Sequence, residues 1–312
     1  MKKSSKKRNK SRPNYKLHLL FWLCIIAGAL WIAFAPKPPR YHPETVHVRV
    51  EQPPEPETKP EIPQPELPPM GDERAQTESP IPVVPPPLPH HVGLNPEIAI
   101  VIDDVGLDLK GSKRAINLPA SVTLSFMPYA PRLREQTSEA RENGHELMLH
   151  MPMEPMGHDD PGPGALLVDL PMDELRQRFQ NALASFTGFD GVNNHMGSKF
   201  TSYSEGMEMV VDELQERHLF FLDSRTSAKS VGENIAREHN LPTIARDVFL
   251  DDVIEVDAIR AQLVQAEHVA RRKGYAVAIG HPHAATMDAL EQWLPEAEAH
   301  GFKLVPVREL LR

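Results

Sequence analysis

Two adjacent carboxylates, Asp103 and Asp104, end an apolar segment that reads IAIVI over residues 98–102. Such an unbroken apolar run is typical of a strand that is buried on both faces. Adjacent carboxylates repel each other, and both lose hydration when they approach a protein core. A chain that places them there usually compensates with a cation, so the pair indicates a metal site if further ligands reach the same place.

Other apolar segments also end in titratable or amide side chains, and these are His150, Asn193-Asn194-His195, Asp223-Ser224-Arg225, Arg246-Asp247, Asp251-Asp252 and His281-Pro282-His283. In alternating β/α folds, the carboxyl ends of parallel strands meet at one edge, where sites form. Asp and His from separate strands supply oxygen and imidazole ligands and leave a position for water. We therefore expect a divalent metal, Zn²⁺ first, with Co²⁺, Ni²⁺ or Mn²⁺ as alternatives. One carboxylate of the Asp103-Asp104 pair would bind it and the other would act as a base.

Each of these residues also has a purely structural interpretation. The alternatives are a helix cap for Asp103-Asp104, a satisfied core histidine for His150, a turn for Asn193-Asn194, an ion pair for Asp223 with Arg225, and a surface turn for His281-Pro282-His283. Each alternative is reasonable for a single residue. Their convergence at one end of one sheet favours a site.

Strand-like and helix-like segments alternate from Pro96 to the end of the chain. The expected strands cover residues 97–104, 121–128, 145–153, 192–198, 219–227, 241–252, 275–283 and 302–307, and the expected helices cover 131–144, 171–186, 203–218, 231–240, 255–274 and 285–301. Repeated β/α units require a parallel sheet, because each helix returns the chain to the same end. The count favours a closed or partly closed (β/α) barrel with seven or eight strands, and an open doubly wound sheet is the alternative.

The first 93 residues differ in composition from the rest. Residues 1–16 hold eight Lys or Arg and no acidic residue, and residues 17–35 form an apolar segment of membrane-spanning length. Residues 36–93 are rich in proline and poor in aromatic residues, which predicts a disordered spacer. We therefore expect a cytoplasmic basic end, a transmembrane anchor or signal segment, a Pro-rich linker, and a globular domain over residues 94–312.

Charge and cysteine content narrow the function further. The net charge is −9 although the N-terminus is basic, so we expect no nucleic-acid partner. The only cysteine, Cys24, lies in the apolar segment, so the part beyond it forms no disulfide and must rely on its core. Ala33-Phe34-Ala35 has the small-x-small pattern of a signal-peptidase site, but the length of the apolar segment favours an uncleaved anchor.

Five segments, in this order, resemble the divergent polysaccharide deacetylase family, a distant branch of the carbohydrate esterase family 4 deacetylases. They are IVIDDVG, GHELMLHMPMEP, VNNHMGSKFT, FLDSRTS and AIGHPH. The resemblance covers residues 94–312 and implies a distorted (β/α) barrel. It also implies metal-dependent removal of acetyl groups from an N-acetylated polysaccharide of the cell envelope.

The resemblance implies roles for individual residues. The first Asp of the T-F-D-D-G motif is a base and the second is a metal ligand, which correspond to Asp103 and Asp104. The first His of H-[ST]-x-x-H corresponds to the ligand His150, but Glu154 stands in place of the second, so either Glu154 or His195 completes the set and we favour His195. The L-x-H motif is matched loosely by His281, the general acid.

The remaining motifs of the main family are altered. Its R-x-P-[FY] motif is missing where Asn193-Asn194-His195 stands, and its D-x-x-x-W motif is echoed only by Asp223. We expect four side chains besides Glu154 to contact the substrate or to support the ligands, namely Asn194, Asp223, Arg225 and His283.

The expected partners are an envelope polysaccharide and, through the N-terminal segment, the bacterial inner membrane. The domain would lie in the periplasm, tethered by a single span or released if that segment is cleaved. Two alternatives are a non-catalytic glycan- or protein-binding domain that retains the barrel and a metal hydrolase of another amide or acyl bond.

Overall fold

Strands and helices alternate along residues 95–311, the part of the chain that a computed structural model describes. The predicted basic end, membrane segment and Pro-rich linker lie outside these residues. Within residues 95–311, no helix combines the length and the apolar character needed to cross a bilayer.

The elements follow the predicted alternation closely. The strands are β1 (Glu97–Val105), β2 (Thr123–Phe126), β3 (Leu147–Met153), β4 (Gly191–Met196), β5 (Phe220–Asp223), β6 (Thr243–Ala245), β7 (Val248–Phe249), β8 (Tyr275–Gly280) and β9 (Lys303–Leu304). The α-helices are α2 (Leu109–Ile116), α3 (Leu133–Glu142), α4 (Met172–Leu183), α5 (Ser204–Glu216), α6 (Gly232–Glu238), α7 (Val256–Lys273) and α8 (Ala284–Ala299), and short 3₁₀ helices are η1 (Phe200–Ser202) and η2 (Val307–Leu310).

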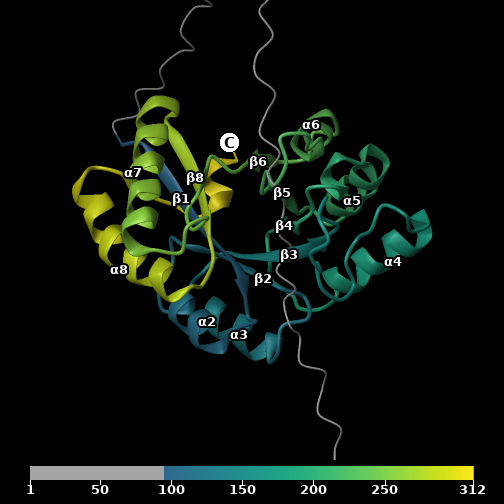
Figure 1. The fold of residues 1–312 in the computed structure, drawn as a ribbon, viewed down its shortest axis with the longest axis horizontal. Helices are drawn as coiled ribbons and strands as arrows, with labels where there is room; N and C mark the ends of the chain where they lie inside the picture. The colour runs from purple at the N-terminus through teal and green to yellow at the C-terminus, as the bar shows by residue number, and fades with distance from the viewer. Residues whose placement is uncertain (1–94, 312) are drawn as a thin grey trace, which may run out of the picture. The chain divides into compact units, whose positions relative to one another are not determined.

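The strands form one parallel sheet in the order β6-β5-β4-β3-β2-β1-β8-β7, and β9 pairs with β1. Figure 1 shows that this sheet is strongly curled, with the helices on its outer side. The predicted distorted (β/α) barrel is therefore confirmed.

The segment predicted as one strand over residues 241–252 is two strands on opposite edges of the sheet. The N–H of Arg246 donates to the carbonyl of Asp223 on β5, and the next N–H, of Asp247, donates to that of Val277 on β8. The chain thus changes partner strand within two residues. The sheet is therefore open between β6 and β7, and we call this opening the seam.

Residues 108–118, which have too few apolar residues to predict an element, contain α2. The Asp108 carboxylate accepts hydrogen bonds from the N–H groups of Lys110 and Gly111 and so caps this helix. The cap lies four residues beyond Asp104, so the Asp103-Asp104 pair does not serve this purpose.

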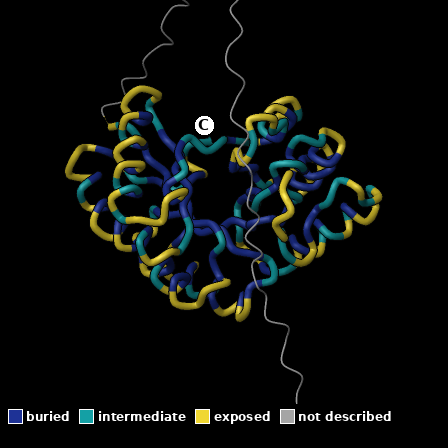
Figure 2. The backbone as a smooth tube through the Cα atoms, viewed as in Figure 1, coloured by how far each residue is buried: buried dark blue, intermediate teal, exposed yellow. Residues whose placement is uncertain are grey.

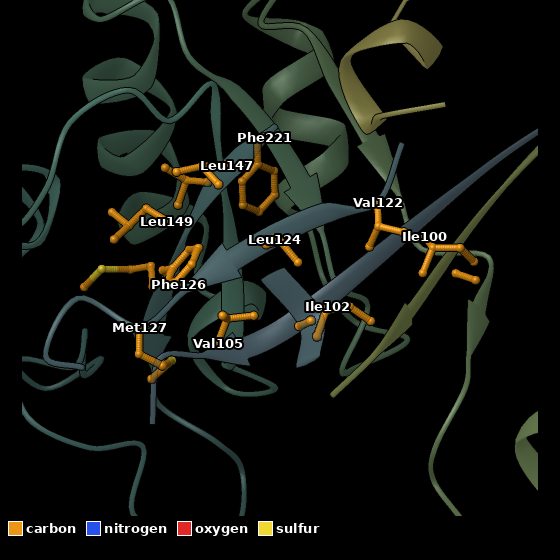
Figure 3. Close-up of a cluster of buried hydrophobic side chains, with 14 of the residues drawn as sticks. Ile100, Ile102, Val105, Val122, Leu124, Phe126, Met127, Leu147, Leu149 and Phe221 are labelled. Carbon is orange, nitrogen blue, oxygen red and sulfur yellow. The ribbon is translucent and has the colours of Figure 1, made fainter. Parts of the chain in front are cut away.

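Apolar side chains form two cores, one on each face of the curled sheet. The outer core lies between strands and helices and includes Ile100, Ile102, Leu124, Phe126 and Leu149 (Figure 3). Figure 2 shows the buried strands at the centre and exposed outer surfaces on the helices. The inner core fills the barrel with Ala99, Val101, Met148, Phe220, Leu222, Ile244, Val277, Ile279 and Val307. Alternate residues of a strand therefore face the barrel interior.

A buried carboxyl group, Glu146, holds η2 against the start of the barrel. Its Oε1 accepts a hydrogen bond from the Thr123 hydroxyl at 2.9 Å, and its Oε2 accepts one from the Arg308 N–H at 3.1 Å. Burial raises the pKa of Glu146 to about 7, against the opposing effect of these hydrogen bonds. The folded chain therefore favours the protonated carboxyl group.

We predict that Glu146→Gln raises the stability of the chain, relative to the wild type, more at pH 8 than at pH 5. A folded-state pKa above the unfolded value means that the wild type loses stability as the pH rises from about 4.5 through about 7. The Glu146→Gln variant does not lose this stability, because its amide does not ionise. The difference between variant and wild type in the free energy of unfolding should grow by about 2 kcal/mol between pH 5 and pH 8.

Urea unfolding of the purified full-length chain at both pH values measures this difference. Glu298→Gln, at an exposed position on α8, is the control because it makes the same change of charge. An equal stability difference at both pH values would contradict the assignment of a raised pKa to Glu146.

Candidate metal centre

Both carboxylates at the end of β1 reach the barrel interior because the strand is irregular there. Asp103 follows the inward-facing Ala99 and Val101 at intervals of two residues, so its side chain lies on the same, inner face of the strand. In a regular strand the next side chain, that of Asp104, would point outward. Asp104 instead has a φ of 55°, in the left-handed region, and the β1–β2 register shifts between Ile102 and Val105. This bulge turns the Asp104 carboxylate toward the imidazoles of β3 and β4.

Asp104, His150 and His195 bring three potential ligand atoms together. Asp104 Oδ1 lies 2.9 Å from His195 Nδ1 and 3.3 Å from His150 Nε2, and the two imidazole nitrogens are 3.3 Å apart. His150 is buried, and Asp104 and His195 are partly buried. Three strands of the sheet, β1, β3 and β4, thus supply one oxygen and two nitrogens from residues up to 91 positions apart in the sequence.

These atoms fit a divalent cation. Ligand atoms that each lie about 2.0–2.2 Å from one Zn²⁺ are about 2.9–3.5 Å from each other, which agrees with the three distances. Asp104 Oδ1 is also buried without a hydrogen bond of regular geometry, and a buried carboxylate oxygen needs a partner. A mixed set of one carboxylate and two imidazoles suits zinc and neighbouring divalent metals.

The side-chain amide of Asn193 connects the base candidate to a ligand candidate. Its Nδ2 donates to Asp103 Oδ1 at 2.8 Å, and its Oδ1 accepts from His150 Nδ1 at 2.8 Å and from the Ser125 hydroxyl at 2.6 Å. Because His150 Nδ1 carries the proton in this bond, Nε2 is left with a free lone pair toward Asp104. Nδ2 also donates to Ser224 at 3.1 Å, so the amide is fully satisfied.

His281, at the end of β8, faces the same carboxylates and is oriented from behind by Asp251. Its Nε2 lies 4.0 Å from Asp104 Oδ2, and its Nδ1 lies 3.0 Å from Asp251 Oδ1. Asp251 Oδ2 accepts from the backbone N–H of His281 at 2.6 Å and from the Thr286 hydroxyl at 2.8 Å. The imidazole is therefore fixed with Nε2 toward the centre.

The pKa values of Asp103, Asp104 and His281 are shifted in different directions by their surroundings. Burial raises the pKa of Asp103 above its usual value, although His150, His281 and Asn193 act in the opposite direction. Burial also opposes ionisation of Asp104, but the imidazoles of His150 and His195 outweigh it and hold the pKa of Asp104 well below its usual range. For His281, the desolvation that disfavours the cation is outweighed by Asp251 and Asp103, which raises the pKa to about 9.

Glu154 lies outside the group of ligand atoms. Its Oε1 pairs with Lys199 Nζ at 2.7 Å, and its Oε2 accepts from the Val168 N–H at 2.6 Å. Because β3 stays extended to Met153, four residues separate His150 from Glu154 by about 13 Å along the chain. Of the two candidates for the third ligand, the geometry therefore places His195 beside the other two.

The other predicted supporting residues occupy different places. Asn194 is buried, donates to the Met196 carbonyl and accepts from the Ser224 N–H, so it joins the end of β4 to the loop that follows β5. Asp223 accepts from Arg225 N–H, the Ser230 hydroxyl and Glu233 N–H. Both act within the loops that follow β4 and β5.

Arg225 and His283 are exposed near the centre. Arg225 pairs with Glu233 at 3.0 Å. His283 has its ring 5.8 Å from that of His281, and its ligand atom groups with those of Asp251 and His281. In this second group of potential ligand atoms, both Asp251 oxygens already accept hydrogen bonds from His281 or Thr286.

The sequence pattern placed Asn193, Asp251 and Arg246 among the polar residues at the strand ends but gave none of them an individual role. Asn193 and Asp251 support Asp103, His150 and His281, and Arg246 lies near enough to interact with the Asp103 charge. A signal for Asn193 was present, because it has the same strand alternation as His195. Asp251 was also among the polar residues at predicted strand ends, but its contact with His281 depends on the pairing of β7 (Val248–Phe249) with β8, which the sequence pattern does not give.

Comparison with known proteins places these residues in a family. An uncharacterized protein of Haemophilus influenzae is 38% identical over 198 residues, which cover 64% of this chain and 71% of that protein. The uncharacterized protein YibQ of Escherichia coli is 36% identical over 196 residues, which cover 63% of this chain and 61% of YibQ. The chain thus spans about three fifths of the length of YibQ.

A solved structure and a family model agree with these relatives. The crystal structure of an uncharacterized Agrobacterium tumefaciens protein superposes with a TM-score of 0.68 at 33% identity, covering 69% of this chain and 89% of that one. The sequence model of the family described as divergent polysaccharide deacetylase matches residues 100–311, which include every residue of the candidate centre. The chain belongs to the divergent polysaccharide deacetylase family.

Proposed function

We propose that the chain is a metal-dependent deacetylase that hydrolyses the acetamide groups of an N-acetylated polysaccharide in the cell envelope. The observation that carries the proposal is the convergence of Asp104, His150 and His195 beside Asp103 and His281. Membership of the deacetylase family supports a polysaccharide substrate. The alternative of a domain that only binds glycan does not account for a buried second carboxylate, Asp103, outside the ligand group.

The metal would be held by Asp104 Oδ1, His150 Nε2 and His195 Nδ1. A divalent ion in such a site supplies a Lewis acid that polarises the amide carbonyl and lowers the pKa of water. Asn193 supports this site indirectly, since its bond to His150 Nδ1 fixes which nitrogen faces the ion.

Proton transfers are assigned to Asp103 and His281. Asp103 lies 3.6 Å from His150 Nε2, with its carboxylate held by Asn193, and accepts the proton of the attacking water. His281 Nε2 donates a proton to the nitrogen of the leaving amine, while Asp251 holds Nδ1 and stabilises the imidazolium. The carbon–nitrogen bond breaks, and the products are acetate and a free amino sugar.

We also propose that residues 17–35 anchor the domain to the inner membrane and that the domain acts in the periplasm. The support is the sequence pattern of a basic flank before an uncharged apolar segment. The Pro-rich residues 36–93 would act as the spacer between membrane and substrate.

We predict that His195→Ala lowers zinc affinity by more than about 100-fold, whereas Glu154→Gln leaves it nearly unchanged. Removing a ligand should cost more than the roughly 10–100-fold typical of residues that only support a ligand. Zinc titration of the full-length chain against a competing chelator measures both affinities. The reverse order would assign the third ligand to Glu154.

We predict that Asp103→Asn lowers acetate release from N-acetylated glycan by at least about 100-fold and keeps the bound zinc. An amide is nearly isosteric with the carboxylate but does not accept the water's proton. Acetate assays and elemental analysis on the same preparations measure the two properties. Undiminished acetate release would remove Asp103 as the base, and wild-type protein that binds glycan without releasing acetate would favour the binding function.

We predict that the full-length chain in bacterial cells fractionates with the inner membrane and that protease added to spheroplasts digests residues 94–312. Deleting residues 1–35 should leave the domain in the cytoplasm, protected from the protease. Protection of the full-length chain would contradict the periplasmic location.

A further inference from the structure

A groove lies at the seam, the opening between β6 and β7, beside the candidate metal centre. Its volume is about 580 Å³, and it is lined by Arg225, Thr226, Arg246, Asp247, Val248, Phe249, Asp252, Gln262 and Gln265. The groove exists because β6 and β7 do not pair, so that residues 246–247 cross between the two edges of the sheet. The mechanism described above uses none of the lining residues.

The Arg246 guanidinium lies in this groove and forms no direct ion pair with a carboxylate of the described residues. Its Nε donates to the Ser224 carbonyl at 2.6 Å, and one terminal nitrogen donates to the Arg225 carbonyl at 2.9 Å. Its guanidinium lies over the Phe249 ring, 5.0 Å from the centroid. Among residues 95–311, no carboxylate oxygen lies within 4.0 Å of it, and burial lowers the pKa of Arg246.

Arg225 adds a second positive charge at the rim. More than half of its side chain is exposed, and its partner Glu233 also pairs with Arg237, so one carboxylate serves two guanidinium groups. Of the two acids that line the groove, Asp247 is paired with Lys273 at 2.9 Å and Asp252 is exposed. The groove therefore holds two guanidinium groups, of which only Arg225 has an ion-pair partner, and one acid, Asp252, that forms no ion pair with the described residues.

The other lining residues suit a sugar. Gln262 and Gln265 are exposed on the same side of α7, three residues apart, and form no hydrogen bonds with other described side chains, so their amides are available for hydroxyl groups. Phe249 offers an apolar edge between Arg246 and His281. Guanidinium groups bind carboxylates through paired, planar hydrogen bonds.

Two contacts place the groove next to the candidate centre. The Phe249 ring lies 5.5 Å from the His281 ring, and Ser224, whose carbonyl binds Arg246, also accepts a hydrogen bond from Asn193. A sugar in the groove would therefore adjoin the sugar whose amine is released beside His281.

We propose that the seam groove binds a carboxylate-bearing sugar adjacent to the N-acetylated sugar, with Arg225 and Arg246 holding the carboxylate. Resting on the proposed deacetylase function, this assigns the substrate to the acidic N-acetylated glycans. A neutral homopolymer would offer no carboxylate to Arg246, which has no ion-pair partner among the described residues, and none to the exposed Arg225, whose partner Glu233 is shared with Arg237.

The test compares two disaccharides of similar size. One carries the free lactyl carboxylate of N-acetylmuramic acid linked to N-acetylglucosamine, and the other is neutral N,N′-diacetylchitobiose. Calorimetric binding to the full-length Asp103→Asn chain, which should not turn either over, is expected to favour the acidic disaccharide by about tenfold or more. Arg225→Gln in this background should reduce that preference about fivefold.

Arg237→Gln is the matched control, because it removes the same charge from the same partner, Glu233, outside the groove. It should leave the preference unchanged. Arg225 is exposed, so its replacement should not disturb folding. Equal binding of both disaccharides, or an equal effect of the two substitutions, would overturn the proposal.

The outcomes also separate this proposal from the deacetylase function. An acidic preference in a chain whose wild type releases no acetate would support the groove and reject the deacetylase. Acetate release without an acidic preference would support the deacetylase and reject the groove.

Discussion

Burial of two adjacent carboxylates in the mouth of the barrel is the constraint on which the candidate centre depends. Removing one partner of a buried ion pair typically costs 3–5 kcal/mol, because the remaining charge is left uncompensated. Asp103 meets this constraint through Asn193, and Asp104 meets it through His150 and His195. Asp104 Oδ1 still has no regular hydrogen bond. A divalent ion bound there would give this buried oxygen the partner that the protein side chains do not supply.

The alternation of inward and outward residues explains how much of this centre the sequence could predict. His150 follows the inward-facing Met148 by two residues, so a strand alone places its imidazole in the barrel. The left-handed backbone of Asp104 is different, because a regular strand predicts that only one carboxylate faces inward. The division of residues 241–252 also escapes prediction, since it depends on which strands supply the carbonyls for Arg246 and Asp247.

The departure from the main family's metal motif has a physical explanation in β3. Because the strand stays extended through Met153, a residue four positions after His150 is carried well beyond the candidate metal centre. The neighbouring strand places another imidazole beside His150, since Pro152 on β3 is in register with His195 on β4. Glu154 is then free for a structural task, and its bonds to Lys199 and Val168 join two of the loops around the centre.

The open seam relates the fold to the proposed polysaccharide substrate. A closed ladder between β6 and β7 would satisfy the edge groups and leave access only from the end of the barrel. Here Arg246 and Asp247 donate their N–H groups to β5 and β8 instead, so the opening forms without leaving those two donors unpaired. A polymer needs an approach that extends past the reacting sugar on at least one side. The groove beside Phe249 and His281 would give the proposed polymer that approach, at the place where the barrel does not close.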